Sequence, residues 1–315
     1  MAEPKRLAEV QRALRLTALL LEIAGVLERA GVEFIAFKGP TLSLLLYGDF
    51  ATRAYGDLDL LVSPDDLVRA HGALTEVDFE PDFEVGDAQL RWLANQHNEF
   101  GLVRNGARVE LHTAVVRPGY RFSLSFEDLM PHQINVQVAG RVLPVLRNEA
   151  LAVVLAVHGA KHAWSRRSWI EDFAKLAFGS VAIDWEQILA FADQQCATRF
   201  VLQGAWLARL VFEVSLPPIV EQRLRNDPAG RFSARFAKSV GPRGSDSLTL
   251  LAFTLGMSDR ASRLRVVQQL FVDPSPLDCQ LVDLPEPLFP LYHAVRPLRL
   301  LVKHVLRVRR PLWGG

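Results

Sequence analysis

The sequence has few cysteines, little net charge and no long uninterrupted apolar run. Its 315 residues include only two cysteines, Cys196 and Cys279, so neither a disulfide scaffold nor a cysteine-based zinc site is expected. The formal net charge of +1 gives no global attraction to nucleic acid. The most apolar N-terminal run, residues 16–27, contains Glu22 and is too short to cross a bilayer. We therefore expect a cytoplasmic protein.

Apolar spacing divides the chain into a mixed first half and a helical second half. The first half combines helical spacing at 5–30, a strand at 32–37, a helix from Ser63 to about residue 76, and hairpins at 97–116 and 133–145. Helices are expected afterwards at 148–162, 168–179, 184–196, 199–214, 217–226, 246–256 and 259–272. We predict an α+β protein with a mixed-sheet domain at 1–146 packed, without a linker, against an all-helical domain at 147–315.

Two carboxylates stand two residues apart in an otherwise apolar run, GDLDLLV at 56–62. Because side chains alternate across a strand, Asp57 and Asp59 project from one face while Leu58 and Leu60 point into a core. Neighbouring carboxylates that lose solvation are costly to pack unless a cation lies between them. The pattern indicates a divalent metal site, although the same spacing also occurs on solvated strands.

A turn upstream of this strand combines a cation, a glycine and a helix start. Lys38 and Gly39 follow the strand at 32–37 and precede a helical run. Glycine lets the backbone approach a ligand closely, and free amides at a helix start attract phosphate oxygens. Arg53 could add positive charge there, or could instead pair as scaffolding with Asp49 or Asp57.

The order of these motifs resembles the polymerase-beta-like nucleotidyltransferase superfamily. More narrowly, FKGPT at 37–41, LYGD at 46–49, Arg53 and the Asp-x-Asp strand are similar to a bacterial family known as uncharacterised nucleotidyltransferase. The resemblance implies a nucleotidyltransferase fold in which the glycine turn holds nucleotide phosphates and the Asp-x-Asp strand binds Mg²⁺ or Mn²⁺. Pro40 is a departure, because the superfamily turn has a second small residue there.

A third carboxylate is expected on the second strand of the first hairpin. Metal-dependent nucleotidyl transfer needs a further acid to hold or activate the attacking oxygen. Glu110 lies between Val109 and Leu111, so it faces the opposite side together with His112. In the resembled family an acid followed by Leu-His occupies this strand. The alternative is that Glu110 belongs to an exposed hairpin pair.

The helical half carries a second constellation. His158, Lys161 and His162 share one helical face. The two histidines could bind zinc, but Gly159 stands where the metalloprotease pattern requires Glu, and histidines buried at an interface are an alternative. The segment resembles the family's second signature, His-x-x-Lys-His-x-Trp followed by Trp-x-x-Asp, which implies that these residues line the cleft. Ser168 is expected to cap the second of two helices.

Taken together with the family resemblance, these residues predict metal-dependent transfer of a nucleoside monophosphate from a nucleoside triphosphate to an acceptor hydroxyl. The acceptor could be a small molecule, a peptide or protein, or an RNA end. Asp57, Asp59 and Glu110 are expected to be catalytic and to hold the metal. Nucleotide or acceptor binding is expected from eight further residues: Lys38, Gly39, Thr41, Arg53, His112, His158, Lys161 and His162. The alternatives are glycosyl or phosphoryl transfer in the same acidic site, or a noncatalytic nucleotide-binding interaction protein.

Residues 296–310 contain no acid and have the pattern of a basic amphipathic helix. Such a helix could lie on anionic lipid or bind a polyanion. The favoured interpretation is a terminal helix that packs its Leu and Val face on the domain and leaves its basic side in water. No strong signal for a nucleic-acid or membrane partner follows.

Overall fold

A five-stranded mixed sheet forms the centre of the first half of the chain in the computed structural model, which describes residues 2–179, 183–240 and 246–302. The strands lie in the order β1 (Phe34–Ala36), β2 (Asp57–Val62), β5 (Ala107–His112), β4 (Glu99–Arg104) and β3 (Glu80–Pro81). β2 and β5 run parallel, whereas the other neighbours are antiparallel. The mixed sheet and the helices that follow confirm the α+β class.

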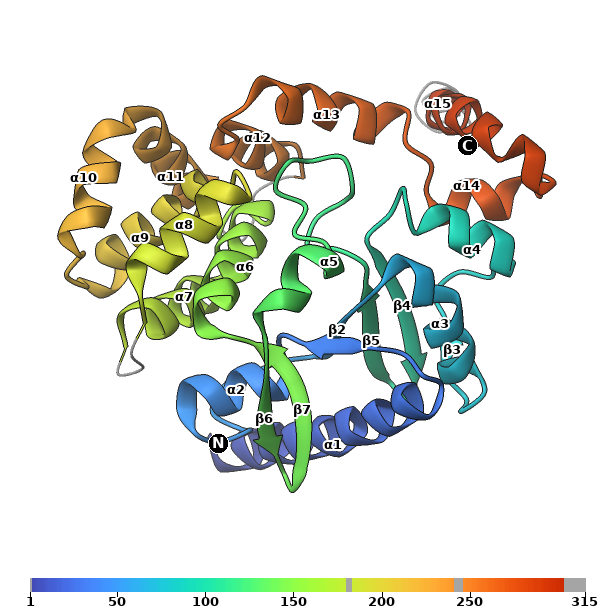
Figure 1. Cartoon of the computed structure of the whole chain (residues 1–315), viewed down its shortest axis with the longest axis horizontal. Helices are drawn as coiled ribbons and strands as arrows, with labels where there is room; N and C mark the ends of the chain where they lie inside the picture. Colours follow the sequence, from blue (N-terminus) through green and yellow to red (C-terminus); the bar gives the residue numbers. More distant parts are fainter. Residues whose placement is uncertain (1, 180–182, 241–245, 303–315) are drawn as a thin grey trace, which may run out of the picture.

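One face of the sheet is covered by helices (Figure 1). α1 (Ala2–Arg29) and α3 (Leu67–Thr75) pack there. Leu20 and Ile23 of α1 share a core with Leu58 and Leu60 of β2 and with Leu111 of β5. This burial fixes the register of the strands, because a one-residue slip would turn their polar residues into the core. The opposite face carries the polar side chains of β2 and β5 together with Ile35 and Leu61, which pack toward the helical half.

Both predicted hairpins are present. Asn105 and Gly106 connect β4 and β5 with φ values of 52° and 73°. Ala139 and Gly140 connect β6 (Gln133–Val138) and β7 (Arg141–Leu146), which form a separate two-stranded sheet, with φ values of 46° and 89°. Two successive left-handed residues match the right-handed twist of paired strands, which is why such sequences predict hairpins. Arg141 ties this second hairpin to α1 by donating to the carbonyl oxygen of Leu21 at 2.9 Å.

Smaller elements complete the first half. α2 (Pro40–Tyr47) follows β1, and the 3₁₀ turn η1 (Pro64–Asp66) precedes α3. The Ser63 hydroxyl accepts a hydrogen bond from the Asp65 amide and so caps the start of this segment, where the sequence predicts a helix to begin. α4 (Asp87–Leu93), α5 (Phe126–Leu129) and the 3₁₀ turn η2 (Met130–His132) are short helices that the sequence pattern did not predict.

The second half is helical, as expected. Within the described residues, β7 is followed by a run of helices: α6 (Asn148–Lys161), α7 (Arg167–Phe178), α8 (Trp185–Gln194), α9 (Thr198–Phe212), α10 (Pro218–Asn226), α11 (Pro228–Val240), α12 (Asp246–Gly256) and α13 (Arg260–Phe271). α11 was not predicted; its buried residues are small: Gly230, Ser233, Ala234 and Ala237. Ile35, Phe37 and Leu61 pack in one core with α6. The domain boundary at residue 146 stays a prediction.

The chain then returns from the helical half to the sheet side, where α14 (Pro276–Leu281), the 3₁₀ turn η3 (Glu286–Leu291) and α15 (Tyr292–Leu301) lie beside α4 (Figure 1). Trp92 of α4 contacts the rings of Phe289 and Tyr292. Gln89 donates to the Tyr292 hydroxyl at 3.0 Å. These contacts hold the C-terminal helices on the first half of the chain.

The expected orientation of the basic C-terminal helix is wrong for its described part. Arg296 and Arg299 pair with the buried Asp278, whereas Leu298 and Leu301 are 61% and 57% exposed. A buried carboxylate needs cationic partners, and this requirement outweighs burial of the two leucines. Residues 303–310 lie outside the described ranges. In the part of the chain that is described, every helix is too short or too polar to cross a bilayer.

Candidate active site

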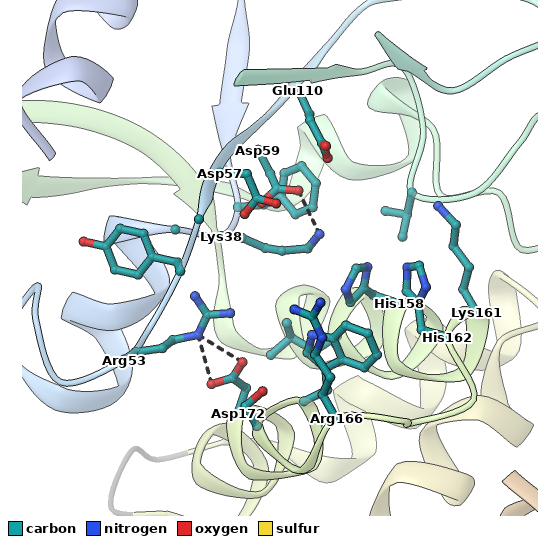
Figure 2. Close-up of a pocket in the computed structure, with 18 of the residues that line it drawn as sticks. Lys38, Arg53, Asp57, Asp59, Glu110, His158, Lys161, His162, Arg166 and Asp172 are labelled. Atoms are coloured by element: carbon teal, nitrogen blue, oxygen red, sulfur yellow. Dashed lines mark hydrogen bonds and ion pairs between the residues drawn. The ribbon is translucent and has the colours of Figure 1, made fainter. Parts of the chain in front are cut away.

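Parallel pairing of β2 and β5 brings the predicted carboxylates together. The register places Asp59 beside Glu110. Leu60 is buried against α1, so alternation directs Asp57, Asp59, Glu110 and His112 to the opposite face. Figure 2 shows the side chains of Asp57, Asp59 and Glu110 turned toward one space. Their placement on two strands makes this acidic face rigid.

The Lys38–Gly39 turn lies directly beside these carboxylates. Gly39 has φ 60° and ψ −132°, a conformation that favours glycine, and a Cβ there would lie 3.2 Å from the carbonyl oxygen of Asp57. Lys38 Nζ donates to Asp59 Oδ1 at 2.8 Å. Thr41 does not line the cavity described below; its hydroxyl donates to the Lys38 carbonyl oxygen at 2.8 Å. Thr41 therefore holds the turn in shape.

Arg53 links the loop before β2 to α7. Its Nε lies 3.0 Å from both carboxylate oxygens of Asp172. The side chains of Arg53 and Asp172 are 12% and 3% exposed. The alternative in which Arg53 pairs with Asp49 or Asp57 is wrong, because its carboxylate partner is Asp172. The Asp49 carboxylate instead accepts hydrogen bonds from its own loop, including the amide of Thr52 at 2.8 Å.

Aromatic and cationic side chains from α6, α7 and the segment between them form the opposite wall, which we call the helical wall: His158, Lys161, His162, Arg166 and Trp169. Figure 2 shows the first four of these across the cavity from the acidic strands. The His158 and His162 ring centroids are 4.8 Å apart, and Trp169 lies 5.4 and 5.0 Å from them. The Arg166 guanidinium stacks over Trp169 at 5.2 Å. The predicted face of His158, Lys161 and His162 is thus turned toward the acidic strands.

Two expectations about this segment are wrong. α7 begins at Arg167 with Arg166 at its N-cap, so Ser168 lies inside the helix and does not cap it. Trp164 is buried among the helices, and its Nε1 donates to Gln203 at 3.0 Å. Trp164 therefore belongs to the helical core, although the second signature led us to expect it in the cleft.

A cavity of about 380 Å³ separates the acidic strands from the helical wall. Ten of the eleven predicted site residues line it: Lys38, Gly39, Arg53, Asp57, Asp59, Glu110, His112, His158, Lys161 and His162. Residues from separate parts of the sequence thus meet around one space large enough for a small ligand.

Burial and charge set the protonation of the three carboxylates. Burial, with the nearby charges of Asp59 and Glu110, raises the pKa of Asp57. Burial would also raise the pKa of Asp59, but Lys38 and His112 outweigh it and hold that pKa well below the usual range. Burial likewise opposes ionisation of Glu110, yet contacts with His112 and Arg108 lower its pKa to about 2. Asp59 and Glu110 are therefore held ionised by adjacent cations.

His112 lies between two of these acids. Its Nε2 is 3.2 Å from Asp59 Oδ1 and 3.5 Å from Glu110 Oε2. Burial favours the neutral ring, but the two carboxylates outweigh it and raise the pKa of His112. Within the described part of the chain, Asp59, Glu110 and His112 offer ligand atoms that all lie within 4.8 Å of one another, a spacing that a metal ion can bridge.

In the helical wall, burial and neighbouring cations lower the pKa values of the basic side chains. Burial, reinforced by Lys38 and other nearby cations, lowers the pKa of His158 far below its ordinary value. Burial and Lys161 lower the pKa of His162 to about 3. Lys161 Nζ lies 3.6 Å from Glu99 Oε2, and burial lowers its pKa as well. The wall therefore presents uncharged imidazoles at neutral pH.

A family model described as uncharacterised nucleotidyltransferase matches residues 3–213, more than half of the chain. The chain belongs to this family. It is therefore a nucleotidyltransferase, and the resemblance seen in its motifs is confirmed. No curated protein matches it.

Solved structures similar to this nucleotidyltransferase are distant. ANT(2'')-Ia in complex with adenylyl-2''-tobramycin is 12% identical, with a TM-score of 0.42 over 57% of this chain and 97% of that one. Lincomycin-bound LnuA, a lincosamide antibiotic adenylyltransferase, is 13% identical, with a TM-score of 0.37 over 51% and 96%. An antigenic nucleotidyltransferase-like protein from Paracoccidioides brasiliensis is 16% identical, with a TM-score of 0.37 over 64% and 98%.

Sequence reasoning missed several residues that line or support the site of this nucleotidyltransferase. Arg108 donates to Glu110 at 2.8 Å, and Glu99 lies opposite His112 in the hairpin register. Both could have been found by counting back from the two-residue turn, because hairpin register follows from turn length. No sequence pattern indicated that Arg166 lines the site, because its position depends on where α7 begins.

Proposed function

We propose that this nucleotidyltransferase transfers a nucleoside monophosphate from a nucleoside triphosphate to an acceptor hydroxyl, with Mg²⁺ or Mn²⁺ as the metal cofactor. One observation carries the proposal: Asp57, Asp59 and Glu110 converge from two neighbouring strands on a cavity that is also lined by the cations Lys38 and Arg53. Family membership supports the reaction class.

The chemistry of the acidic face fits a divalent metal ion. Three carboxylates share one partly buried site, and the raised pKa of Asp57 reflects burial and the repulsion of Asp59 and Glu110. Carboxylate oxygens are the ligands that Mg²⁺ prefers, and all three side chains are candidates to hold it. When bound, the ion would neutralise phosphate charge and polarise the reacting phosphoryl group.

The Lys38–Gly39 turn and Arg53 are placed to bind the phosphates. Lys38 Nζ already lies among the carboxylates, and Gly39 leaves room for a phosphate to approach the backbone. Arg53 is anchored through its Nε to Asp172, while its buried Nη1 has no hydrogen-bond partner among the described residues. A buried donor without a partner is costly, and a phosphate oxygen would satisfy it.

The helical wall would hold the acceptor against the α-phosphate. The acceptor oxygen forms a bond to the α-phosphorus, the bond from that phosphorus to the oxygen bridging to the β-phosphate breaks, pyrophosphate leaves, and the hydroxyl proton passes to water. Glu110 was expected either to hold a metal or to accept this proton. Its pKa of about 2, held there by His112 and Arg108 against the effect of burial, favours the metal-holding role.

Mass spectrometry of candidate acceptors tests the proposal. Each nucleoside triphosphate is incubated with the protein, an acceptor mixture and Mg²⁺ or Mn²⁺, and products are examined for the added mass of a nucleoside monophosphate. Asp57→Asn should abolish the product, whereas the exposed Asp65→Asn serves as the matched control and should retain it. Undiminished turnover by Asp57→Asn would contradict the proposal. An added hexose or phosphate would identify glycosyl or phosphoryl transfer instead.

A further inference from the structure

His112 lies on the acidic face of the sheet, whereas the other two histidines that line the cavity, His158 and His162, belong to the helical wall. It is the last residue of β5, and its Nε2 approaches Asp59 Oδ1 at 3.2 Å and Glu110 Oε2 at 3.5 Å. The ligand atoms of the three residues lie within 4.8 Å of one another. An ion bound among them would meet two oxygens and one nitrogen.

The His112 ring is buried and fixed, and the two carboxylates lie near its Nε2. The side chain is 5% exposed, and the ring packs edge-on against Phe37 at a centroid distance of 5.4 Å. Neither ring nitrogen has a hydrogen-bond partner of acceptable geometry among the described residues, although both carboxylates are close. Buried polar atoms without partners are uncommon in folded proteins, and an absent ion is one recognised explanation.

We propose that His112 is a metal ligand, so that the site binds a divalent transition-metal ion, with Mn²⁺ as the probe, in preference to Mg²⁺. This inference rests on the proposed function, because it assigns a donor to the same metal site. Mg²⁺ strongly prefers oxygen ligands, whereas transition-metal ions accept imidazole nitrogen. Asp59, Glu110 and His112 together offer both oxygen and nitrogen ligands, a donor set that suits a transition-metal ion.

The other explanation for His112 is that its imidazolium form serves as a fixed cation between the carboxylates. The two roles make different predictions for bound Mn²⁺. A ligating imidazole places nitrogen in direct contact with the ion, whereas an imidazolium is repelled by it and leaves an all-oxygen shell. A measurement that detects nitrogen bound to Mn²⁺ therefore separates them without any reference to turnover.

Electron paramagnetic resonance of Mn²⁺ added to the nucleotide-free protein is the test. We expect nitrogen modulation of the spin echo in the wild type, and its loss in His112→Asn together with an Mn²⁺ affinity weakened by about tenfold or more. His112→Asp should shift selectivity toward Mg²⁺ by making the donor set all oxygen. His97→Asn is the control, because His97 is a partly buried histidine that does not line the cavity.

Absence of nitrogen modulation in the wild type would overturn the inference, and this result does not depend on any variant folding. An unchanged ratio of Mn²⁺ to Mg²⁺ affinity in folded His112→Asn would overturn it as well. Neither result touches the proposed function, which fails separately if no metal supports nucleotidyl transfer by the wild type.

Discussion

The buried carboxylate of Asp172 in α7 holds Arg53 of the loop before β2, and the arginine Nε lies 3.0 Å from both of its oxygens. The two residues are 119 positions apart in the chain. Their ion pair fixes the helical wall relative to the acidic strands and leaves one guanidinium edge at the cavity. The pair therefore contributes both to stability and to the shape of the site.

Removing Arg53 should destabilise the protein more than removing the charge of Asp172. Arg53→Met leaves Asp172 buried without a cation and should lower the free energy of unfolding by ~3–5 kcal/mol. Asp172→Asn should cost less, because the remaining guanidinium faces the cavity and can be hydrated. Urea denaturation followed by circular dichroism measures both values.

The control for that comparison is the exposed pair of Arg223 and Asp193, whose side chains are 45% and 44% exposed. Arg223→Met should change the free energy of unfolding by less than ~1 kcal/mol. Equal losses for Arg53→Met and Arg223→Met would show that burial of the Arg53–Asp172 pair does not determine its contribution.

Lys38→Met should have opposite effects on metal binding and on turnover. Lys38 Nζ contacts the Asp59 oxygen that a metal would need, so its removal should tighten divalent-metal binding to the nucleotide-free protein by several-fold. The same change removes a phosphate-binding cation and should lower turnover. Calorimetric metal titration and product assay measure the two effects. Weaker metal binding by Lys38→Met would contradict the competition that we infer, and Lys161→Met is the control that should leave metal affinity unchanged.

Gly39→Ala should damage the site through the backbone. The new Cβ would be forced into a conformation that favours glycine and would lie 3.2 Å from the Asp57 carbonyl oxygen. We expect a stability loss of ~1–3 kcal/mol and a clear loss of nucleotide affinity. Gly48→Ala is the control: Gly48 also has positive φ, 73°, but a Cβ there meets nothing within 4 Å. Equal loss of nucleotide affinity in the two variants would count against a close approach at Gly39.

The pH dependence of stability should depend on His162. Burial and Lys161, with Lys38 and Arg166, lower its folded pKa to about 3, while the unfolded value is about 6.5. Between these values the unfolded chain binds the additional proton, so stability should fall as pH decreases from about 6.5 toward about 3. His162→Asn should reduce this slope by up to ~1.4 kcal/mol per pH unit. Urea denaturation at a series of pH values measures it; an unchanged slope would show that His162 is not desolvated.

Much of the site could be predicted because it depends on local periodicity. The alternation around Asp57 and Asp59, the two-residue turn at Asn105 and Gly106, and the helical face of His158 are properties of short segments. Each segment is held in register by apolar neighbours, so the polar side chains must emerge on the other face.

The features that could not be predicted depend on tertiary contacts that no local sequence pattern encodes. The partner of Arg53 is decided by where α7 packs, and Trp164 is buried because α9 provides Gln203 for its indole. α15 turns two arginines inward because Asp278 lies buried beside it. In each case a buried polar group determined the outcome, and its partner lies more than fifteen residues away in sequence.

Nucleoside triphosphates labelled separately at the α- and γ-phosphorus test the central claim most directly. The protein is incubated with each labelled nucleotide, a divalent metal and an acceptor mixture, and the label is followed into product. We predict that the α-label enters the acceptor product while the γ-label leaves as pyrophosphate, and that Asp57→Asn and Asp59→Asn abolish both. Transfer of the γ-label to the acceptor, or α-label transfer that survives in both variants, would contradict the account.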